Sequence, residues 1–179
     1  MGDSCQPRTP AQRRAATAAG RPLRVGTDCS GLDTPIAALE EILLGRNRRI
    51  HHVFSSELDP KTRQILLHNF TPDYHYTDVA RRALRLGGPG NEHPAVDQLP
   101  NLDIYVAGFP CQPFASCGLS AGAEDPRGLV WFHIVRFLAV ALPRGVVLEN
   151  VKGLVSQHKN TFATMIELLE SIGEYDWHT

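Results

Sequence analysis

Short apolar runs alternate with longer amphipathic segments from Leu23 to the end of the chain. The short runs have the length of buried strands, and the longer segments repeat apolar residues at the spacing of a helix face. This alternation is typical of successive βα units, which form a parallel sheet with helices on both faces. The pattern therefore predicts an α/β fold with a Rossmann-like, mostly parallel sheet. The predicted strands are 23–27, 52–56, 74–77, 103–107 and 146–149, and the predicted helices are 34–44, 59–67, 129–142 and 162–172.

Capping signals define the ends of the first two helices. Thr34 is the expected N-cap of the first, with Pro35 at its first position and Gly45 after its last turn. Asp59 and Pro60 open the second helix in the same way. The apolar residues of the first helix that should face the sheet are Ile36, Leu39, Ile42 and Leu43. In the third helix, the sheet-facing core should contain Trp131 and Phe132.

Some segments lack either pattern. Residues 1–22 carry four arginines against one acidic residue, so we expect a disordered basic tail before a single domain over 23–179. An organelle-targeting peptide would have a similar composition. Residues 86–101 are rich in glycine and proline, which favours a surface loop. The arginines of 46–49 and 81–85 are expected to solvate a helix end or a loop.

Composition narrows the class of protein. A hydrophobic content of 42% over 179 residues suffices for one core, and no stretch approaches the ~18 apolar residues that span a bilayer. We therefore expect a soluble intracellular protein without a secretion signal. The four cysteines are too few and too irregularly spaced for a disulfide scaffold or a zinc site, and the eight histidines predict no metal site either. The formal net charge of −1 does not indicate a nucleic-acid binder, so only motifs can support such a function.

Candidate chemistry lies at the carboxyl ends of the predicted strands, where ligands bind to open parallel sheets. Glu57, Asp78, Cys111 and Glu149 all fall at or just past such ends. In AGFPCQPF, residues 107–114, two prolines bracket Cys111 and exclude a helix, so the thiol is held in an extended turn after a buried strand. Taken alone, each of these residues could have a structural role in place of a catalytic or binding one. A lone cysteine is often a small buried hydrophobe, and an acidic residue at a strand end often caps a turn.

The combination of GFPCQPF with ENVKGL at 149–154 resembles the paired signature of the cytosine-5 DNA methyltransferase family, and 23–179 follows that family's order of motifs. The resemblance implies the sheet of S-adenosylmethionine-dependent methyltransferases, S-adenosylmethionine as cofactor and DNA as partner. It also implies that the chain holds the N-terminal, cofactor-binding and catalytic half of the family's domain. The sheet should then be incomplete at the C-terminus, and the 179 residues alone should transfer little or no methyl group.

The resemblance assigns roles to individual residues. Cys111 is the expected nucleophile, which attacks carbon 6 of cytosine, and Glu149 is the carboxyl group that contacts ring nitrogen 3 and the exocyclic amine. Glu57 is the expected ribose ligand, and Asp78 with Val79 is the pair that reads the adenine. The other expected cofactor contacts are Asp28, Cys29, Ser30, Gly31, Leu32, Leu58, Pro110 and Val130. The expected substrate contacts are Gln112, Ser116, Arg127 and Asn150.

The match departs from the family in two loops. The family's first cofactor loop contains an acidic residue, an aromatic residue and several glycines, so the cofactor contact of this chain should be altered. In the catalytic loop, Ala115 stands where a serine is expected, and Ser116 follows it. In the first loop, Thr27 stands at the position of the acidic residue, and Asp28 follows it. Cys29 stands at the position of the aromatic residue, and Asp33 and Thr34 replace glycines.

Three other functions compete with DNA methylation. A branch of the same family methylates transfer RNA with the same cysteine. A regulatory homologue could keep the fold and bind S-adenosylmethionine without catalysis. An ordinary nucleotide-binding oxidoreductase is disfavoured, because no GxGxxG follows the first strand. The target sequence and protein partners are not encoded in these motifs, and the location would be nuclear in a eukaryote and cytoplasmic otherwise.

Overall fold

Five strands form one parallel sheet in the computed structural model, which describes residues 21–178 except 47, 91, 93 and 111–128. The strands are β1 (Leu23–Asp28), β2 (Ile50–Ser56), β3 (Tyr74–Tyr76), β4 (Ile104–Gly108) and β5 (Gly145–Glu149). Their order is β3-β2-β1-β4-β5, and every pairing is parallel. The chain thus turns one way from β1 to β3 and the other way from β4 to β5, which places the ligand crevice of such folds beyond the carboxyl ends of β1 and β4. The predicted α/β fold is confirmed.

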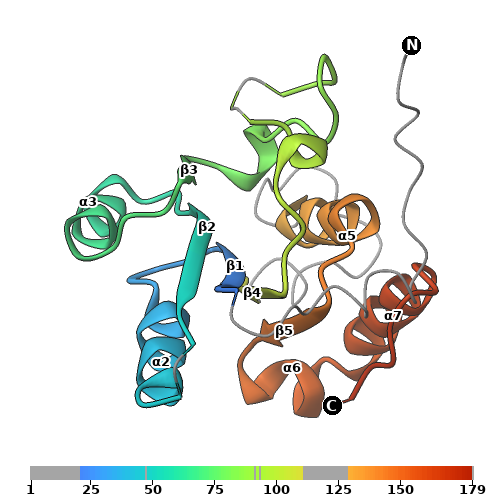
Figure 1. Cartoon of the computed structure of the whole chain (residues 1–179). Helices are drawn as coiled ribbons and strands as arrows, with labels where there is room; N and C mark the ends of the chain where they lie inside the picture. The colour runs from blue at the N-terminus through green and yellow to red at the C-terminus, as the bar shows by residue number, and fades with distance from the viewer. Residues whose placement is uncertain (1–20, 47, 91, 93, 111–128, 179) are drawn as a thin grey trace.

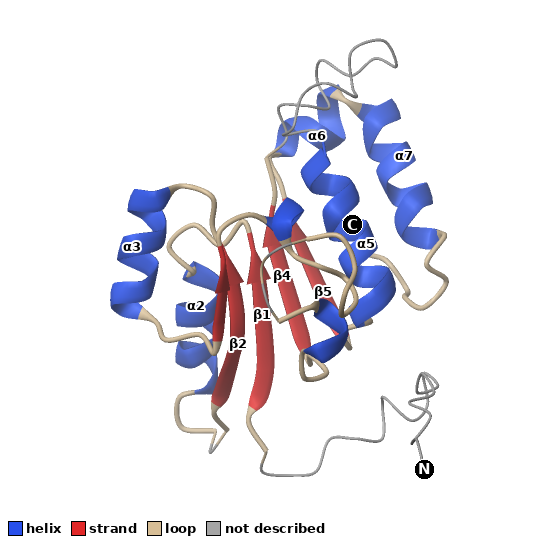
Figure 2. Ribbon diagram, turned by 90° about the horizontal axis from the view of Figure 1, so that it is seen from above, coloured by secondary structure: helices blue, strands red, loops and turns tan. Residues whose placement is uncertain are grey.

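Helices cover both faces of this sheet. They are α2 (Thr34–Leu43), α3 (Pro60–Asn69), α5 (Leu129–Ala141), α6 (Lys152–Gln157) and α7 (Lys159–Glu170), with the short 3₁₀ segments η1 (Val79–Arg81) and η2 (Val96–Gln98). Figure 1 shows α2 and α5 on opposite sides of the sheet, and Figure 2 shows the strands side by side. The sequence pattern missed α6, whose N-cap Val151 offers no side-chain hydrogen bond that a capping signal could reveal. Among the described residues, no helix is long and apolar enough to cross a membrane.

The start of α2 differs from the prediction. Its N-cap is Asp33 rather than Thr34, and Asp33 adopts the left-handed conformation, with φ 59° and ψ 36°. The Asp33 side chain makes no capping bond, because other partners engage it in the site described below. Ile36 is buried as expected, whereas Ile42 is 56% exposed, so the prediction that Ile42 faces the sheet is wrong.

The main core lies between the sheet and α5. Trp131, Phe137 and Leu138 of α5 are buried there, against Phe54 of β2 and Tyr105 of β4. Phe132, in contrast, is 48% exposed, because it points away from the stripe of α5 that faces the sheet. The expectation that Trp131 is core is therefore confirmed, and the same expectation for Phe132 is wrong.

Arg82 is part of this core, contrary to the expectation that the basic residues of 81–85 only solvate a loop. Its side chain is 1% exposed, and its guanidinium carbon lies 5.0 Å from the ring centre of Phe54 and 4.4 Å from that of Phe137. A guanidinium is weakly hydrated and stacks on aromatic rings, which makes it the cation best suited to such burial. The sequence around Arg82 carries no signal for this placement, because the aromatic partners come from distant segments.

Candidate active site at the carboxyl edge of the sheet

The carboxyl ends of all five strands meet at one edge, and the residues that follow them form the candidate site. The turn at 29–33 follows β1, Glu57 follows β2 and Asp78 follows β3. Phe109 and Pro110 follow β4, and Asn150 follows β5. The parallel sheet therefore brings together the described residues that the sequence nominated from five separate segments.

Left-handed backbone shapes the turn after β1. Cys29, Gly31 and Asp33 all have positive φ, at 50°, 55° and 59°. For Cys29 and Asp33 this conformation is costly, and such outliers persist where the surroundings hold the backbone in place. Hydrogen bonds to β2 provide that hold, because the Ser30 amide donates to the carbonyl of Ser56 at 2.9 Å and the Ser30 hydroxyl accepts from the Ser56 amide at 3.0 Å.

Glu57 joins this turn to the segment after β2. One carboxylate oxygen accepts the backbone N–H of Gly31 at 2.8 Å, and the other accepts the N–H of Asp59 at 2.8 Å. Each oxygen retains a second lone pair for another donor. Beside this link, Leu32 is 55% exposed and Leu58 is 69% exposed. The edge therefore presents an acidic group flanked by exposed apolar side chains.

Asp33 anchors the first turn of α2 to two strands. Its Oδ1 accepts the hydroxyl proton of Thr27 on β1 at 2.8 Å, and its Oδ2 accepts a short hydrogen bond from Ser55 on β2. The Nε2 of His52 lies 3.2 Å from Asp33 Oδ2 and 2.7 Å from the Ser55 hydroxyl. Because Asp33 is fully buried, these partners replace the water that a carboxylate would otherwise bind. From the sequence, Asp33 is predicted only to replace a glycine of the first loop. No local pattern predicts its contacts with Thr27, Ser55 and His52.

Asp28 is engaged in the core and turns away from the site. Its two oxygens accept hydrogen bonds from Arg82 at 2.8 and 2.6 Å, and the Tyr105 hydroxyl donates to it at 2.7 Å. Its side chain is 0% exposed, so Asp28 has a structural role beneath the turn at 29–33. The cofactor contact expected of Asp28 stays a prediction. The arrangement balances the buried charge of Arg82 by that of Asp28.

Cys29 is partly buried between the turn and the core. Burial, and then the negative charges of Asp28 and Glu57, raise the pKa of the Cys29 thiol to about 12. A thiol with such a pKa carries almost no thiolate at neutral pH, and thiolate is the nucleophilic form. Cys29 is therefore unsuited to be the catalytic cysteine.

Asp78 and Val79 form the start of η1. Asp78 caps this segment by accepting the backbone N–H of Ala80 at 2.8 Å. Such capping is the common structural role of an aspartate before a turn. The second oxygen of Asp78 has no such capping partner among the described residues. Val79 is 7% exposed. Pro110 and Val130, the other nominated apolar contacts, are each partly buried.

The ends of β4 and β5 are paired. Gly108 is opposite Glu149 in the parallel register, and a Cβ placed on Gly108 would lie 3.2 Å from Oε2 of Glu149. Asn150 then donates from Nδ2 to the carbonyl of Phe109 at 2.8 Å and accepts the N–H of Val151 at 2.8 Å. Glu149 is exposed at this edge. The segments that carry GFPC and ENV thus leave the sheet as neighbours.

The remaining nominated residues of the catalytic loop lie outside the described part of the chain. They are Cys111, Gln112, Ser116 and Arg127. Their assignments stay predictions from sequence. Within the described residues, no group of histidine, cysteine and acidic side chains could hold a metal ion.

Comparisons with known proteins identify the family. The model of the family described as C-5 cytosine-specific DNA methylase matches residues 30–179. The chain belongs to this family. The Type II methyltransferase M.NlaIV of Neisseria lactamica is 34% identical over 131 residues, which cover 69% of this chain and 28% of that protein. M1.ScrFI of Lactococcus lactis subsp. cremoris is 33% identical over 137 residues, covering 75% of this chain and 31% of that protein.

The chain spans about a third of the length of such relatives. M.NgoBI of Neisseria gonorrhoeae, at 35% identity, matches over 68% of this chain and 35% of its own length. Among solved structures, precorrin-6y C5,15-methyltransferase from Geobacter metallireducens GS-15 aligns with a TM-score of 0.47 and 18% identity, covering 92% of this chain and 70% of that one. The family assignment therefore rests on the sequence matches, and the fold assignment rests on the sheet itself.

Proposed function

We propose that the protein transfers a methyl group from S-adenosylmethionine to carbon 5 of cytosine in DNA, with Cys111 as a covalent nucleophile. The observation that carries this proposal is the pairing of Gly108 with Glu149. Because β4 and β5 are adjacent, the segment that leads into Cys111 and the segment that begins with Glu149 leave the sheet toward the same region. Membership of the C-5 cytosine-specific DNA methylase family supports DNA as the substrate class.

The described residues fit S-adenosylmethionine. Glu57 keeps acceptor capacity for ribose hydroxyls, and the exposed side chains of Leu32 and Leu58 offer apolar surface that a nucleoside would cover. The oxygen of Asp78 that does not accept from Ala80 is suited to an adenine amine. When bound, S-adenosylmethionine supplies a methyl group already activated as a sulfonium. The share of the chain is to position the reacting groups and to stabilise charge.

Cys111 and Glu149 then activate the base. The Cys111 thiolate would add to carbon 6 of cytosine, and the ring electrons that this addition displaces make carbon 5 a nucleophile. Glu149 would hold the ring through nitrogen 3 and the exocyclic amine. After methylation, water takes the carbon-5 proton, the electrons of that bond restore the double bond between carbons 5 and 6, and the bond from carbon 6 to the Cys111 sulfur breaks. Because both ring atoms are inaccessible in a duplex, the target base must be flipped out of the helix.

Covalent trapping tests this proposal. The full-length protein is incubated with S-adenosylmethionine and a duplex containing 5-fluorocytosine, which lacks the proton that the last step removes. We expect a denaturant-stable adduct that is absent in Cys111→Ser and still present in Cys29→Ser, because the Cys29 thiol is protonated at neutral pH. A transfer RNA carrying the same base serves as the comparison substrate. Absence of any Cys111-dependent adduct on either nucleic acid would refute the covalent mechanism.

A further inference from the structure

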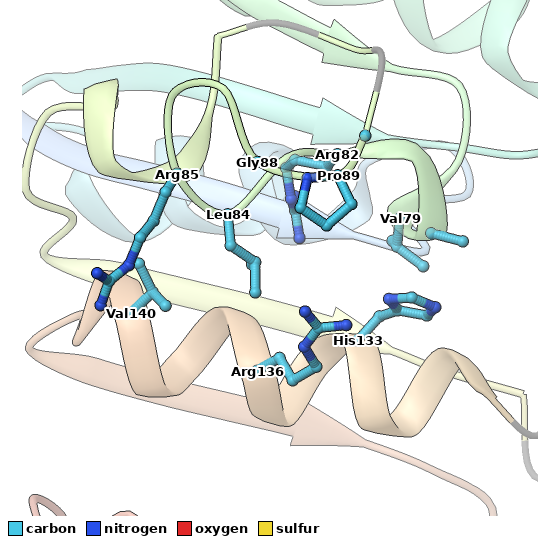
Figure 3. Close-up of a pocket in the computed structure, with 11 residues that line it drawn as sticks. Val79, Arg82, Leu84, Arg85, Gly88, Pro89, His133, Arg136 and Val140 are labelled. Carbon is cyan, nitrogen blue, oxygen red and sulfur yellow. The ribbon is translucent and has the colours of Figure 1, made fainter.

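A cavity lies between α5 and the loop that follows η1, and at one end it reaches Val79 of the candidate site. Its volume is about 340 Å³, near the lower end of the range for small-molecule pockets. Figure 3 shows His133 and Arg136 on successive turns of α5, facing a wall built by Leu84 and Pro89 of the loop. Arg85 lies at the other end, next to Val140. The cavity is large enough for a ligand of the size of a nucleoside monophosphate.

Two arginines bring positive charge to this cavity, and Asp78, the carboxylate that acts on His133, lies outside its lining. Arg85 and Arg136 are both exposed, and neither makes an ion pair with any residue in the described ranges. No aspartate or glutamate lines the cavity. Arg82, which also lines it, adds no unbalanced charge because Asp28 neutralises it. Unpaired cations in a concave site with low-dielectric walls attract anions.

His133 lies beside Arg136 in this cavity. Burial, and then the neighbouring Arg136 guanidinium, lower the pKa of His133, against the opposite effect of the Asp78 carboxylate. The ring is therefore neutral at pH 7, where it can donate one N–H to an anionic oxygen beside Arg136. An anion bound to both side chains would form charge-assisted hydrogen bonds, which are stronger than those between neutral groups.

The rest of the wall is apolar and closely fitted. Leu84, Pro89 and Val140 supply apolar surface between the cationic ends. Gly90 allows the loop to approach the backbone of Ala83 closely, because a Cβ at Gly90 would lie 2.5 Å from the backbone nitrogen of Ala83. A small inorganic ion would leave most of this surface uncovered. The wall therefore favours an anion attached to a larger, apolar or aromatic body.

We propose that this cavity binds a phosphate group carried by such a body, with the phosphate on Arg136 and His133 and with Arg85 as the second cation. The phosphate belongs either to a free nucleotide or to a strand of nucleic acid. The cavity adjoins the proposed cofactor site at Val79, whereas Arg136 and Arg85 belong to the cavity alone. The proposal does not require that the chain be catalytically active.

Calorimetric titration of the 179-residue chain with adenosine monophosphate, adenosine and inorganic phosphate tests the site, in the presence of S-adenosylhomocysteine to occupy the proposed cofactor site. We expect saturable binding of adenosine monophosphate, weaker binding of phosphate and no binding of adenosine. Arg136→Gln should weaken the binding about tenfold or more, and Arg85→Gln should weaken it less. The control Arg49→Gln removes an exposed arginine outside the cavity and should leave the affinity unchanged.

Two results would overturn the proposal. One is adenosine binding as tightly as its monophosphate, and the other is an affinity for the monophosphate that Arg136→Gln does not change. Circular dichroism of each variant verifies that the fold is retained. A short DNA duplex, added as competitor, identifies the source of the phosphate. Displacement of the nucleotide by the duplex assigns the cavity to a nucleic-acid strand, and retention assigns it to a free nucleotide.

Discussion

Asp33 combines an unfavourable backbone with a favourable set of side-chain contacts. Its φ of 59° is a conformation that glycine adopts without strain and that costs other residues about 1 kcal/mol. Its buried carboxylate accepts hydrogen bonds from Thr27 and Ser55 and lies beside His52. Hydrogen bonds to a charged group contribute about 1.5–3 kcal/mol each. The contacts therefore outweigh the strain, which explains why an aspartate is stable in this left-handed conformation.

Asp33→Gly should for this reason lower the free energy of unfolding by about 2 kcal/mol or more, although it relieves the backbone. Asp33→Asn, which keeps one acceptor oxygen and tolerates the left-handed conformation, should lower it less. Urea unfolding followed by circular dichroism measures both. A glycine variant as stable as the parent chain would show that the contacts of Asp33 contribute nothing net.

The pair of Asp28 and Arg82 makes a second prediction for single residues. Arg82→Leu leaves the Asp28 charge buried without its partner and should cost about 3–5 kcal/mol of stability. The double variant Asp28→Val with Arg82→Leu removes both charges and should recover a large part of that loss. Arg49→Leu, at an exposed site, should change the stability by no more than about 0.5 kcal/mol. Urea titrations of the four chains compare these values, and a double variant no more stable than Arg82→Leu would exclude an unpaired charge as the cause.

Among the elements, β4 and β5 determine how the proposed catalytic groups approach each other. Their register places Gly108 opposite Glu149, with little room between the glycine and the carboxylate. At the other end of the same pair, a Cβ on Gly145 would lie 3.5 Å from the carbonyl of Asp103, which is an ordinary contact. An added Cβ would therefore crowd the Glu149 carboxylate at Gly108 but would crowd nothing at Gly145, so Gly145 is a suitable control position.

Gly108→Ala should displace the Glu149 carboxylate by a few tenths of an ångström and reduce methyl transfer by the full-length protein about tenfold, since small misplacements of reacting groups are costly. The affinity for S-adenosylmethionine should change little, because Glu57 and Asp78 follow other strands and only Pro110 of the expected cofactor contacts follows β4. Gly145→Ala should leave both quantities unchanged. Labelled-methyl transfer and calorimetry measure them, and full activity of Gly108→Ala would contradict a role for the Glu149 position.

For the whole molecule, the buried titratable groups predict a loss of stability in alkali. Burial raises the pKa of Cys29 to about 12 and places the pKa of Tyr105 well above its usual value. In the unfolded chain these groups lose their protons at lower pH than in the folded chain. The free energy of unfolding should therefore fall as the pH rises above about 8.5, the usual pKa of a thiol, at up to ~1.4 kcal/mol per pH unit from Cys29 alone.

Urea unfolding at intervals from pH 7 to pH 10 tests this expectation. The parent chain should lose stability above pH 8.5, and Cys29→Ser, which does not titrate in this range, should lose less. The comparison uses the slope against pH, so any constant effect of the substitution cancels. Identical slopes in the two chains would show that the Cys29 thiol is not shielded from solvent as the structure indicates.

The order and type of the elements follow from short-range pattern. Apolar periodicity located all five strands, and Asp59 with Pro60 marked the start of α3, because helix and strand signals are carried by neighbouring residues. The motifs around Cys111 and Glu149 predict the family, which the match over residues 30–179 confirms, because each motif is a run of neighbouring residues. The same locality explains the missed N-cap at Asp33, where a cap without a capping bond leaves no local sign.

What depended on tertiary structure are the contacts between distant segments. Arg82 meets Asp28 across 54 residues, and Glu57 holds the backbone of Gly31 across 26. The residues adjacent in sequence to one member of such a pair do not predict the other member. The order of strands in the sheet decides which loops meet. The same chain segments in another strand order would keep their helices and strands and lose these contacts. Local sequence therefore specifies the parts of this protein and its candidate chemistry, and the packing of the sheet decides which charges are buried and which side chains remain at the edge.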